Sequence, residues 1–403
     1  MKRHRATTWG RVLKAPVVLP VTLLFVLALS ACSGLLDVDN ESDILDEDRP
    51  VLVSTPPGYE QSGQSYPVLY ITDGDAHLTH TRGTVDFLVQ NGLMPPVIIV
   101  GLPNTDRTRD LTPTHASIVG RDGTPREFPT SGGGNRFLDF FEKELFPWVD
   151  SHYRIQPFRL LAGHSFGGLF ALNAFFTRPA MFEAVIAVSP SLQWDEELPL
   201  RQARSFFADR DELNATLVVA MANEEEGDPA PTRLDQLEKI LQQSSVEGLE
   251  WQVRRLPDET HGSVVLRAHY WGLRRVFRPW HLPADPETGA FAGSLDDLKA
   301  HYENLSKRYE FTVTPPENTV NQIGYQFLGR DDIDDAIAVF RYNVELYPDA
   351  ANVHDSLGEA LEQAGRLPEA FSAYSRAVDN ATAAGDPRLE IFVTNRDRVK
   401  EQL

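Results

Sequence analysis

Short apolar runs alternate with longer stretches of helical periodicity over residues 51–280. The apolar runs are rich in β-branched residues and lie at 68–71, 97–100, 158–162, 184–188, 217–220 and 251–256. Between several of them, apolar side chains recur every three or four positions, as at 135–149, 166–177 and 234–243. Continuous apolar strands separated by helices are typical of a mostly parallel sheet that is buried on both faces. The pattern therefore predicts a doubly wound α/β domain over 51–280.

The strand pattern stops after residue 280. Residues 281–293 are rich in Pro, Gly, Asp and Ala, which is typical of a linker. From Ser294 onward the apolar residues have only helical spacing, and Ser294 to Asp297 has the form of a capped helix start. We therefore expect a second, all-helical domain over 294–403.

Within this helical region a pattern recurs after 34 residues. Its small, aromatic and apolar positions are Gly324, Ala336, Phe340 and Val344, repeated as Gly358, Ala370, Tyr374 and Val378. The period and the pairing of small with large residues resemble the tetratricopeptide repeat, which implies a surface for a protein partner. Two units are fewer than the three usually needed for stability. We therefore expect the helix near 294–312 to cap the stack, or the stack to lean on the α/β domain.

The N-terminus has the pattern of a secretory signal. Residues 1–14 carry five basic residues and no acidic one, and an apolar run follows over 15–29. This run is shorter than the about 20 apolar residues of a membrane span. Residues 29–32, Leu-Ser-Ala-Cys, resemble the lipobox of bacterial lipoproteins, in which the signal is cut before a cysteine that then carries lipid. Because Cys32 is the only cysteine, we expect a signal peptide over 1–31 and lipidation of Cys32.

Charge and cysteine content limit the partners and the location. Removal of the five basic residues in the signal would lower the formal net charge from −20 to −25. Such a surface disfavours nucleic acid and anionic lipid, so that membrane attachment would depend on the acyl chains. The acidic segment 32–50 is expected to be a solvated tether, with an early strand as a possible end. Ser33 after the lipidated cysteine favours the outer membrane, with the protein facing the periplasm.

The candidate chemistry centres on the motif Gly163-His-Ser165-Phe-Gly167. This G-x-S-x-G motif lies between an expected strand and an expected helix, which is the context of the nucleophile elbow of α/β hydrolases. Glycines two residues either side of the serine permit a very tight turn. The motif therefore predicts Ser165 as a nucleophile, whereas His164 is expected to have a packing role.

A serine nucleophile needs a base and an oxyanion hole. His261 follows the last expected strand, in the loop and in the chain order where the base of an α/β hydrolase stands. The backbone N–H of Phe166 and one from Gly74 or Asp75 would form the oxyanion hole. His77 and His80, which lack a third ligand, are expected to be loop or pocket residues. We therefore expect neither a metal nor another cofactor.

Several segments together resemble the Putative esterase family, which includes esterase D and the bacterial ferric-enterobactin esterases. They read VLYITDGD, VGLPNTDRTRDLTPT, GHSFGGLFAL, SPSLQWD and HGS. The resemblance implies an α/β-hydrolase fold over 51–280, a Ser-acid-His triad, and hydrolysis of a small-molecule carboxylic ester. It also implies Glu225 as the acid, with alanine at 222 where the family commonly has glycine. Glu224, Glu226 and, more distantly, Asp195 remain alternatives.

Three further residues are candidates for substrate contacts. Arg107 and Arg109 could bind an anionic acyl group, or could equally form ion pairs with Asp106 and Asp110 that anchor their loop. Trp194, in the SPSLQWD segment, is the third. Two alternatives to ester hydrolysis stay open, because an acyltransferase would use the same triad and a non-catalytic scaffold would use the helical repeats.

Overall fold

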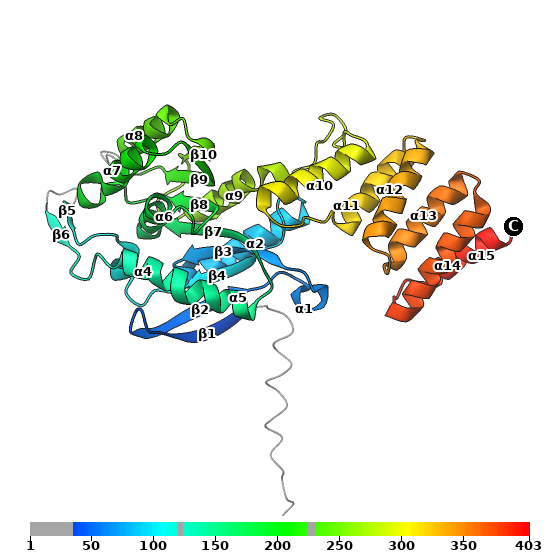
Figure 1. The fold of residues 1–403 in the computed structure, drawn as a ribbon, viewed down its shortest axis with the longest axis horizontal. Coiled ribbons are helices and arrows are strands. Elements are labelled where there is room, and N and C mark those ends of the chain that lie inside the picture. Colours follow the sequence, from blue (N-terminus) through cyan, green and yellow to red (C-terminus); the bar gives the residue numbers. More distant parts are fainter. Residues whose placement is uncertain (1–34, 120–123, 225–229) are drawn as a thin grey trace, which may run out of the picture.

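The computed structural model describes residues 35–119, 124–224 and 230–403 of the 403-residue chain. Figure 1 shows an α/β part, from which an array of helices extends to one side. In the described ranges, no helix is both long enough and apolar enough to cross a membrane.

The α/β part is built on an eight-stranded sheet in the order β1-β2-β4-β3-β7-β8-β9-β10. Neighbouring strands from β4 to β10 in this order are parallel, whereas β2 pairs antiparallel with both β1 and β4. The six parallel strands match the six predicted runs: β3 (Tyr66–Thr72), β4 (Ile98–Leu102), β7 (Ile155–His164), β8 (Ala184–Val188), β9 (Glu212–Ala222) and β10 (Glu247–Leu256). A mostly parallel sheet with this layout is that of an α/β hydrolase, which confirms the predicted class.

Helices cover both faces of the sheet, because alternate strand residues point to opposite sides. Leu69 and Ile71 face a layer that includes α2 (Gly74–Gln90) and α9 (Val264–Val276). Val68 and Tyr70 face the opposite layer. That layer contains α4 (Gly134–Phe140), a π-helical turn (Phe141–Leu145), α5 (Phe146–His152), α6 (Phe166–Thr177), α7 (Trp194–Ala208) and α8 (Ala230–Gln243).

The prediction of a solvated tether over 32–50 is wrong from residue 35 onward, although a strand does lie at its end, as the alternative allowed. Residues 35–54 form a hairpin of β1 (Leu35–Ser42) and β2 (Glu47–Ser54), which extends the sheet at one edge. Arg49 is buried there and forms a 2.7 Å ion pair with the buried Asp110. Ser42 donates a hydrogen bond of 2.5 Å to Glu144. Acidic composition suggested a tether because it does not reveal which polar residues have buried partners.

The helical region begins where the sequence predicts. Helix α10 (Leu295–Tyr309) starts at a capping box formed by Ser294 and Asp297. The helices that follow are α11 (Glu317–Leu328), α12 (Ile333–Leu346), α13 (Ala351–Gln363), α14 (Leu367–Ala384) and α15 (Leu389–Lys400). The repeat has a structural counterpart, since Gly324 and Gly358 each pack against an aromatic ring. A Cβ at Gly324 would lie 2.5 Å from Phe340, and a Cβ at Gly358 would lie 2.7 Å from Tyr374.

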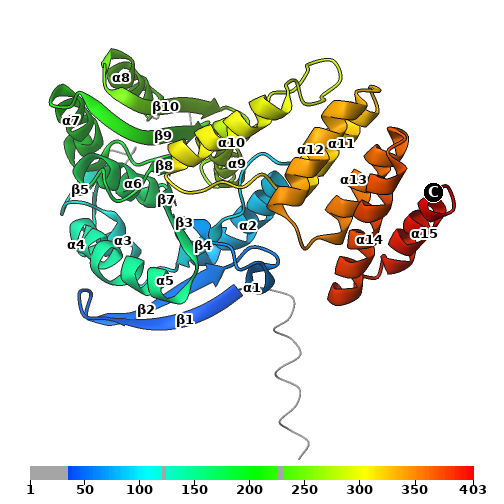
Figure 2. The ribbon, with the colours of Figure 1, turned by 45° about the vertical axis from the view of Figure 1, so that its right-hand side comes forward.

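The two parts share one apolar core. Tyr309 of α10 lies fully buried against Phe158 of β7 and Phe277, with ring centroids 5.0 and 5.6 Å apart. The predicted linker 281–293 has no helix, but Phe291 within it is buried, and its N–H donates to Gln326 of α11. As Figure 2 shows, α10 lies along the α/β part. The helical region is therefore packed onto the α/β part rather than tethered to it.

Candidate active site

Ser165 occupies a strained turn between β7 and α6. Its backbone angles are φ 59° and ψ −113°, which are costly for a residue with a Cβ. The Ser165 N–H donates to Val188 O at 2.9 Å and so ties the turn to β8. A Cβ at Gly163 would overlap the backbone of Gly167, so both flanking glycines are required by close approach. This is the geometry of a nucleophile elbow, which presents the serine side chain above the sheet edge.

The turn after β3 lies directly against this elbow, because β3 and β7 are neighbouring parallel strands. A Cβ at Gly167 would overlap Thr72 Oγ1 and lie 3.2 Å from Asp73 Oδ2. Phe166 starts α6, and Gly74 starts α2. First-turn N–H groups have no acceptor within their own helix, and the helix dipole favours negative charge there. Two helix N-termini thus meet beside Ser165, as an oxyanion hole requires.

Arg107 supports this arrangement from the side. Its guanidinium donates to both oxygens of Asp73, at 2.5 and 3.1 Å, and to His164 O at 3.1 Å. It also lies 5.5 Å from the ring centroid of Phe166. The side chain remains about one-third exposed. Arg107 therefore joins the two turns of the site, but through Asp73 and not through the predicted partner Asp106.

Arg109 lies in an ion-pair network separate from that of Arg107. It contacts Glu47 of β2 at 2.7 Å and Asp110 at 2.7 Å. The Asp106 side chain instead accepts a hydrogen bond from the Arg109 backbone N–H. The loop-anchoring alternative therefore fits Arg109, with Glu47 as a further partner. The Arg109 guanidinium already donates to Glu47, Asp110 and Thr105.

His261 lies in the loop after β10 and meets an acid from the loop after β9. His261 Nδ1 is 3.2 Å from Glu224 Oε1. The Glu224 side chain is 9% exposed, whereas that of His261 is 48% exposed. The two loops are joined by the Asn223 N–H, which donates to Glu259 O at 2.9 Å. Glu225, the acid implied by family resemblance, and its neighbour Glu226 lie outside the described residues.

His261 reaches the elbow next to His164. The ring centroids of the two histidines are 4.7 Å apart. Within the described residues, no hydrogen bond joins the Ser165 hydroxyl to His261. Catalytic hydrogen bonds are often long before substrate binds and tighten in the complex. The structure thus brings Ser165 and His261 to one edge of the sheet without a hydrogen bond between these two described side chains.

Behind His164 lies a group of histidines that are half-buried or buried. Burial, followed by the charges of His261 and His77, lowers the pKa of His164 to about 4. The rings of His77 and His164 are 5.7 Å apart, and His77 Nδ1 is 3.1 Å from His80 Nε2. Burial also lowers the pKa values of His77 and His80. His77 and His80 lie on α2, so the expectation of a loop is wrong for them.

His269 completes this group and was missed by the sequence analysis. It is fully buried on α9, its Nδ1 lies 2.9 Å from Thr81 Oγ1, and its ring is 5.8 Å from that of His80. The part of the chain that the structure describes holds no metal-binding arrangement of three or more such ligands. Only the fold reveals His269, because it occupies an apolar face of a helix without any local motif.

Trp194 supports the wall of the site from inside. It is fully buried, and its Nε1 donates to Thr114 Oγ1 at 3.1 Å. Its ring packs against Phe128 and Phe166, with centroids 5.3 and 5.2 Å away. Because Trp194 is buried, the expected substrate contact fits Phe128 and Phe166 better than Trp194. The rings of these two residues are only half-buried.

With this geometry in view, comparison with known proteins identifies the family. Residues 42–261 match the Putative esterase family. The siderophore enterobactin esterase of Emericella nidulans is 36% identical over 37% of this chain and 54% of its own length. The ferri-bacillibactin esterase BesA of Bacillus subtilis is 29% identical over 53% of this chain and 78% of its own length.

A solved structure extends the likeness. The IroE-like serine hydrolase of Shewanella oneidensis is 30% identical, with a TM-score of 0.66 over 77% of this chain and 99% of that one. The chain spans only about half the length of the Emericella relative, and most of BesA. The family match covers more than half of the chain, from the last residue of β1 to the loop that holds His261. The chain therefore belongs to the Putative esterase family, a family of carboxylic ester hydrolases with the α/β-hydrolase fold.

Proposed function

We propose that this protein is a serine esterase in which Ser165 is the nucleophile, His261 the base and Glu224 the acid that orients it. The observation that carries the proposal is the strained turn at Ser165, beside two helix N-termini and the His261–Glu224 pair. Strain of this kind persists only where the surrounding structure enforces it, and it concentrates at active sites. Glu224 replaces Glu225 in this proposal because the 3.2 Å contact belongs to Glu224.

The mechanism follows from these roles. Ser165 Oγ attacks the ester carbonyl carbon while His261 takes the hydroxyl proton, and the oxygen that becomes negative is held by backbone N–H groups of Phe166 and of Gly74 or Asp75. The carbon–oxygen bond to the alcohol then breaks, and His261 gives its proton to the leaving alcohol. Water, from which His261 takes a proton, then attacks the carbonyl carbon of the acyl-enzyme. This step releases the carboxylic acid product and restores Ser165. Glu224 holds the imidazole with Nδ1–H as donor and stabilises its cation.

The substrate class we propose is a siderophore-type ester, in line with the names of the similar proteins. The half-buried rings of Phe128 and Phe166 offer an aromatic wall for an acyl group. The test compares hydrolysis of enterobactin with that of p-nitrophenyl butyrate by the full chain. We expect kcat/KM to be about 10²-fold or more higher for enterobactin, because a substrate that fills the site gains transition-state binding. Equal values would contradict the substrate class and leave the esterase reaction intact.

We also propose that the chain is a lipoprotein held at the outer membrane through Cys32. The support is the lipobox-like segment, which lies outside the described residues, and the absence of a second cysteine. Cys32→Ala should release the protein into the soluble fraction. Retention of that variant in membranes after a high-salt wash would contradict the anchor.

For α11 to α14 we propose two tetratricopeptide-type units that recruit a protein partner. The support is the 34-residue period together with the two equivalent glycine–aromatic contacts. Arg341 is exposed on α12. Reversal of its charge in Arg341→Glu should lower the recovery of the partner after crosslinking in cells. Unchanged recovery of every crosslinked protein would contradict a partner at this face.

A further inference from the structure

A large cavity lies where the helical array meets the α/β part. Its volume is about 1010 Å³. Tyr66 at the start of β3 and Gln156 near the start of β7 line it, so it opens at the amino ends of the same strands whose carboxyl ends carry the active site. Helices α10 and α11 supply the opposite wall. The cavity is thus a second hollow, separated from Ser165 by the length of the sheet.

The cavity is lined by uncharged side chains, apart from the imidazole of His281. None of the described residues around it is Asp, Glu, Lys or Arg, although such residues make up 24% of the chain. A site for an anion or a cation would be expected to hold an opposite charge, because an unpaired buried ion is costly. The formal net charge of −20 further opposes an acidic ligand. The ligand that fits this lining is neutral.

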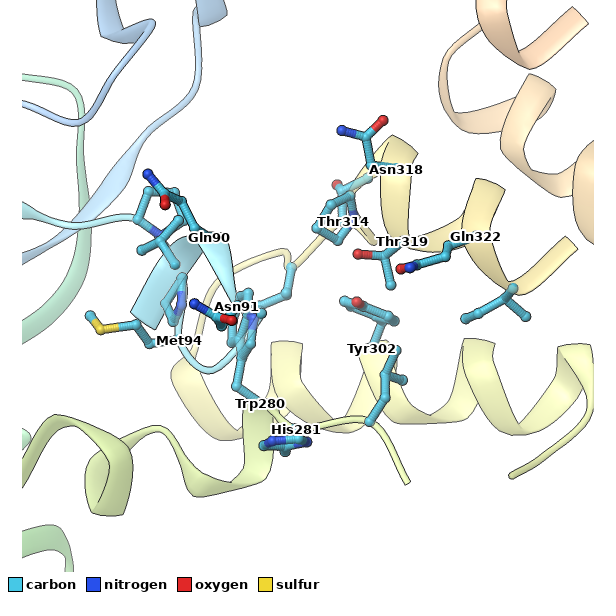
Figure 3. Close-up of a pocket in the computed structure, with 18 of the residues that line it drawn as sticks. Gln90, Asn91, Met94, Trp280, His281, Tyr302, Thr314, Asn318, Thr319 and Gln322 are labelled. Atoms are coloured by element: carbon cyan, nitrogen blue, oxygen red, sulfur yellow. The ribbon is translucent and has the colours of Figure 1, made fainter. Parts of the chain in front are cut away.

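Amide groups face the cavity from both walls. Figure 3 shows Gln90 and Asn91, at the end of α2, across the hollow from Asn318, Thr319 and Gln322 of α11. The side chains of Gln90, Asn318 and Gln322 make no hydrogen bond within the part of the chain that the structure describes. A side-chain amide both donates and accepts, so these groups suit a partner that does both.

Aromatic rings lie between the two walls. Figure 3 places Trp280 and Tyr302 there, on the segment after α9 and on α10. Trp280 is half-buried, which leaves part of its ring open to a ligand. Aromatic rings with amides around them suit a molecule with apolar C–H faces and hydroxyl edges, which is the chemistry of a sugar ring. The volume lies at the upper end of the roughly 300–1,000 Å³ of small-molecule sites, so it holds more than one such ring.

We infer that this cavity binds a neutral oligosaccharide. An extended peptide fits less well, because β3 and β7 are interior strands and offer no free sheet edge for strand addition. A proline-rich peptide could use the aromatic rings, but its prolines have no N–H to donate to the amide oxygens. A hydroxyl group can accept from the NH₂ group of a side-chain amide and can donate to its carbonyl oxygen. The inference concerns binding at a site separate from the esterase reaction, and it does not depend on that reaction.

Isothermal titration calorimetry on the full chain tests the inference. The probes are maltohexaose, cellohexaose and hexa-N-acetylchitohexaose, all neutral, with a proline-rich decapeptide as the rival ligand. We expect saturable binding of at least one oligosaccharide. Gln322→Ala and Asn318→Ala should each weaken it by about 5- to 10-fold, the loss of about one hydrogen bond. Gln363→Ala, an exposed position at the end of α13 outside the cavity, is the matched control and should bind like wild type.

Both test positions are exposed, so thermal unfolding of either variant should match wild type and show that any loss is local. Three results would overturn the inference. The first is no saturable binding of any of the three sugars at up to about 10 mM, which is weaker than the range of specific sites. The second is binding that neither Gln322→Ala nor Asn318→Ala weakens. The third is binding of the decapeptide in place of the sugars.

Discussion

The two ends of the parallel sheet differ in backbone conformation and in charge. At the carboxyl ends, Asp73, Ser165 and Ser189 follow β3, β7 and β8 with φ values of 54°, 59° and 38°. Arg107, Asp73 and the histidines gather at the same edge. At the amino ends, the described lining of the cavity has no acidic or basic side chain other than His281. The difference shows where reactivity can arise. Strained turns and titratable groups with shifted pKa values cluster at catalytic sites, whereas the binding of a neutral molecule needs neither.

The largest effect expected is at the carboxyl ends. Ser165→Ala and His261→Ala should each lower kcat on p-nitrophenyl butyrate by about 10³-fold or more, because the members of such a group act as a unit. The double variant should be little worse than either single one. Steady-state kinetics measure all three, and effects that multiply in the double variant would mean that the two residues do not act in one step.

The next largest effect is a loss of folding stability, expected where α10 packs near the amino ends of the parallel strands. Tyr309→Ala should lower the free energy of unfolding by about 3–5 kcal/mol, since it empties a buried aromatic site between Phe158 and Phe277. Tyr342→Ala, at a half-buried position on α12, is the control and should cost about 1 kcal/mol. Urea unfolding midpoints measure both. Equal shifts would show that α10 does not share the core of the α/β part.

Loss of the Glu224 carboxylate should lower activity less than loss of the Ser165 hydroxyl. Glu224→Gln is expected to lower kcat/KM by about 10²-fold, because it removes the charge that holds the His261 tautomer while His261 stays partly in solvent. Glu225→Gln and Glu226→Gln are the matched controls and should stay within a few-fold of wild type. A large loss at Glu225 with none at Glu224 would return the assignment to the family-implied acid.

The half-buried His164 should give the most gradual effect, a pH dependence of stability. The folded pKa of His164 is about 4, below its ordinary value of 6.5, mainly because of burial. Between these pH values the unfolded chain binds the proton more readily, so stability is full above pH 6.5 and is lost as the pH falls toward 4. The loss from His164 is up to roughly 3 kcal/mol.

His164→Asn should therefore flatten the fall of Tm between pH 6.5 and pH 4.5. His152→Asn is the control, since His152 is exposed at the end of α5 and should leave the slope unchanged. Thermal unfolding followed by circular dichroism across this pH range compares the variants. An unchanged slope in His164→Asn would mean that its burial does not govern the acid sensitivity of the fold.

Local patterns predicted much of this molecule, and long-range contacts decided the rest. The apolar runs predicted all six parallel strands, and the motif around Ser165 predicted the elbow, because each depends on neighbours in sequence. For 35–54 the sequence allowed only an early strand and not the full hairpin, because the partners of Arg49 and Ser42 lie far along the chain, at Asp110 and Glu144. His269 and the cavity were missed for the same reason. The contacts of His269 and the lining of the cavity both come from elements that meet only in the folded chain.

The central claim is that Ser165 is a nucleophile activated by His261. The most direct test is labelling of the full chain with a fluorophosphonate, followed by peptide mass spectrometry, since the probe reacts with an activated serine whatever the natural substrate is. The account predicts one labelled site, at Ser165, that is lost in Ser165→Ala and labelled at least about 10²-fold more slowly in His261→Ala. Labelling that persists in Ser165→Ala, or that proceeds at the wild-type rate in His261→Ala, would contradict it.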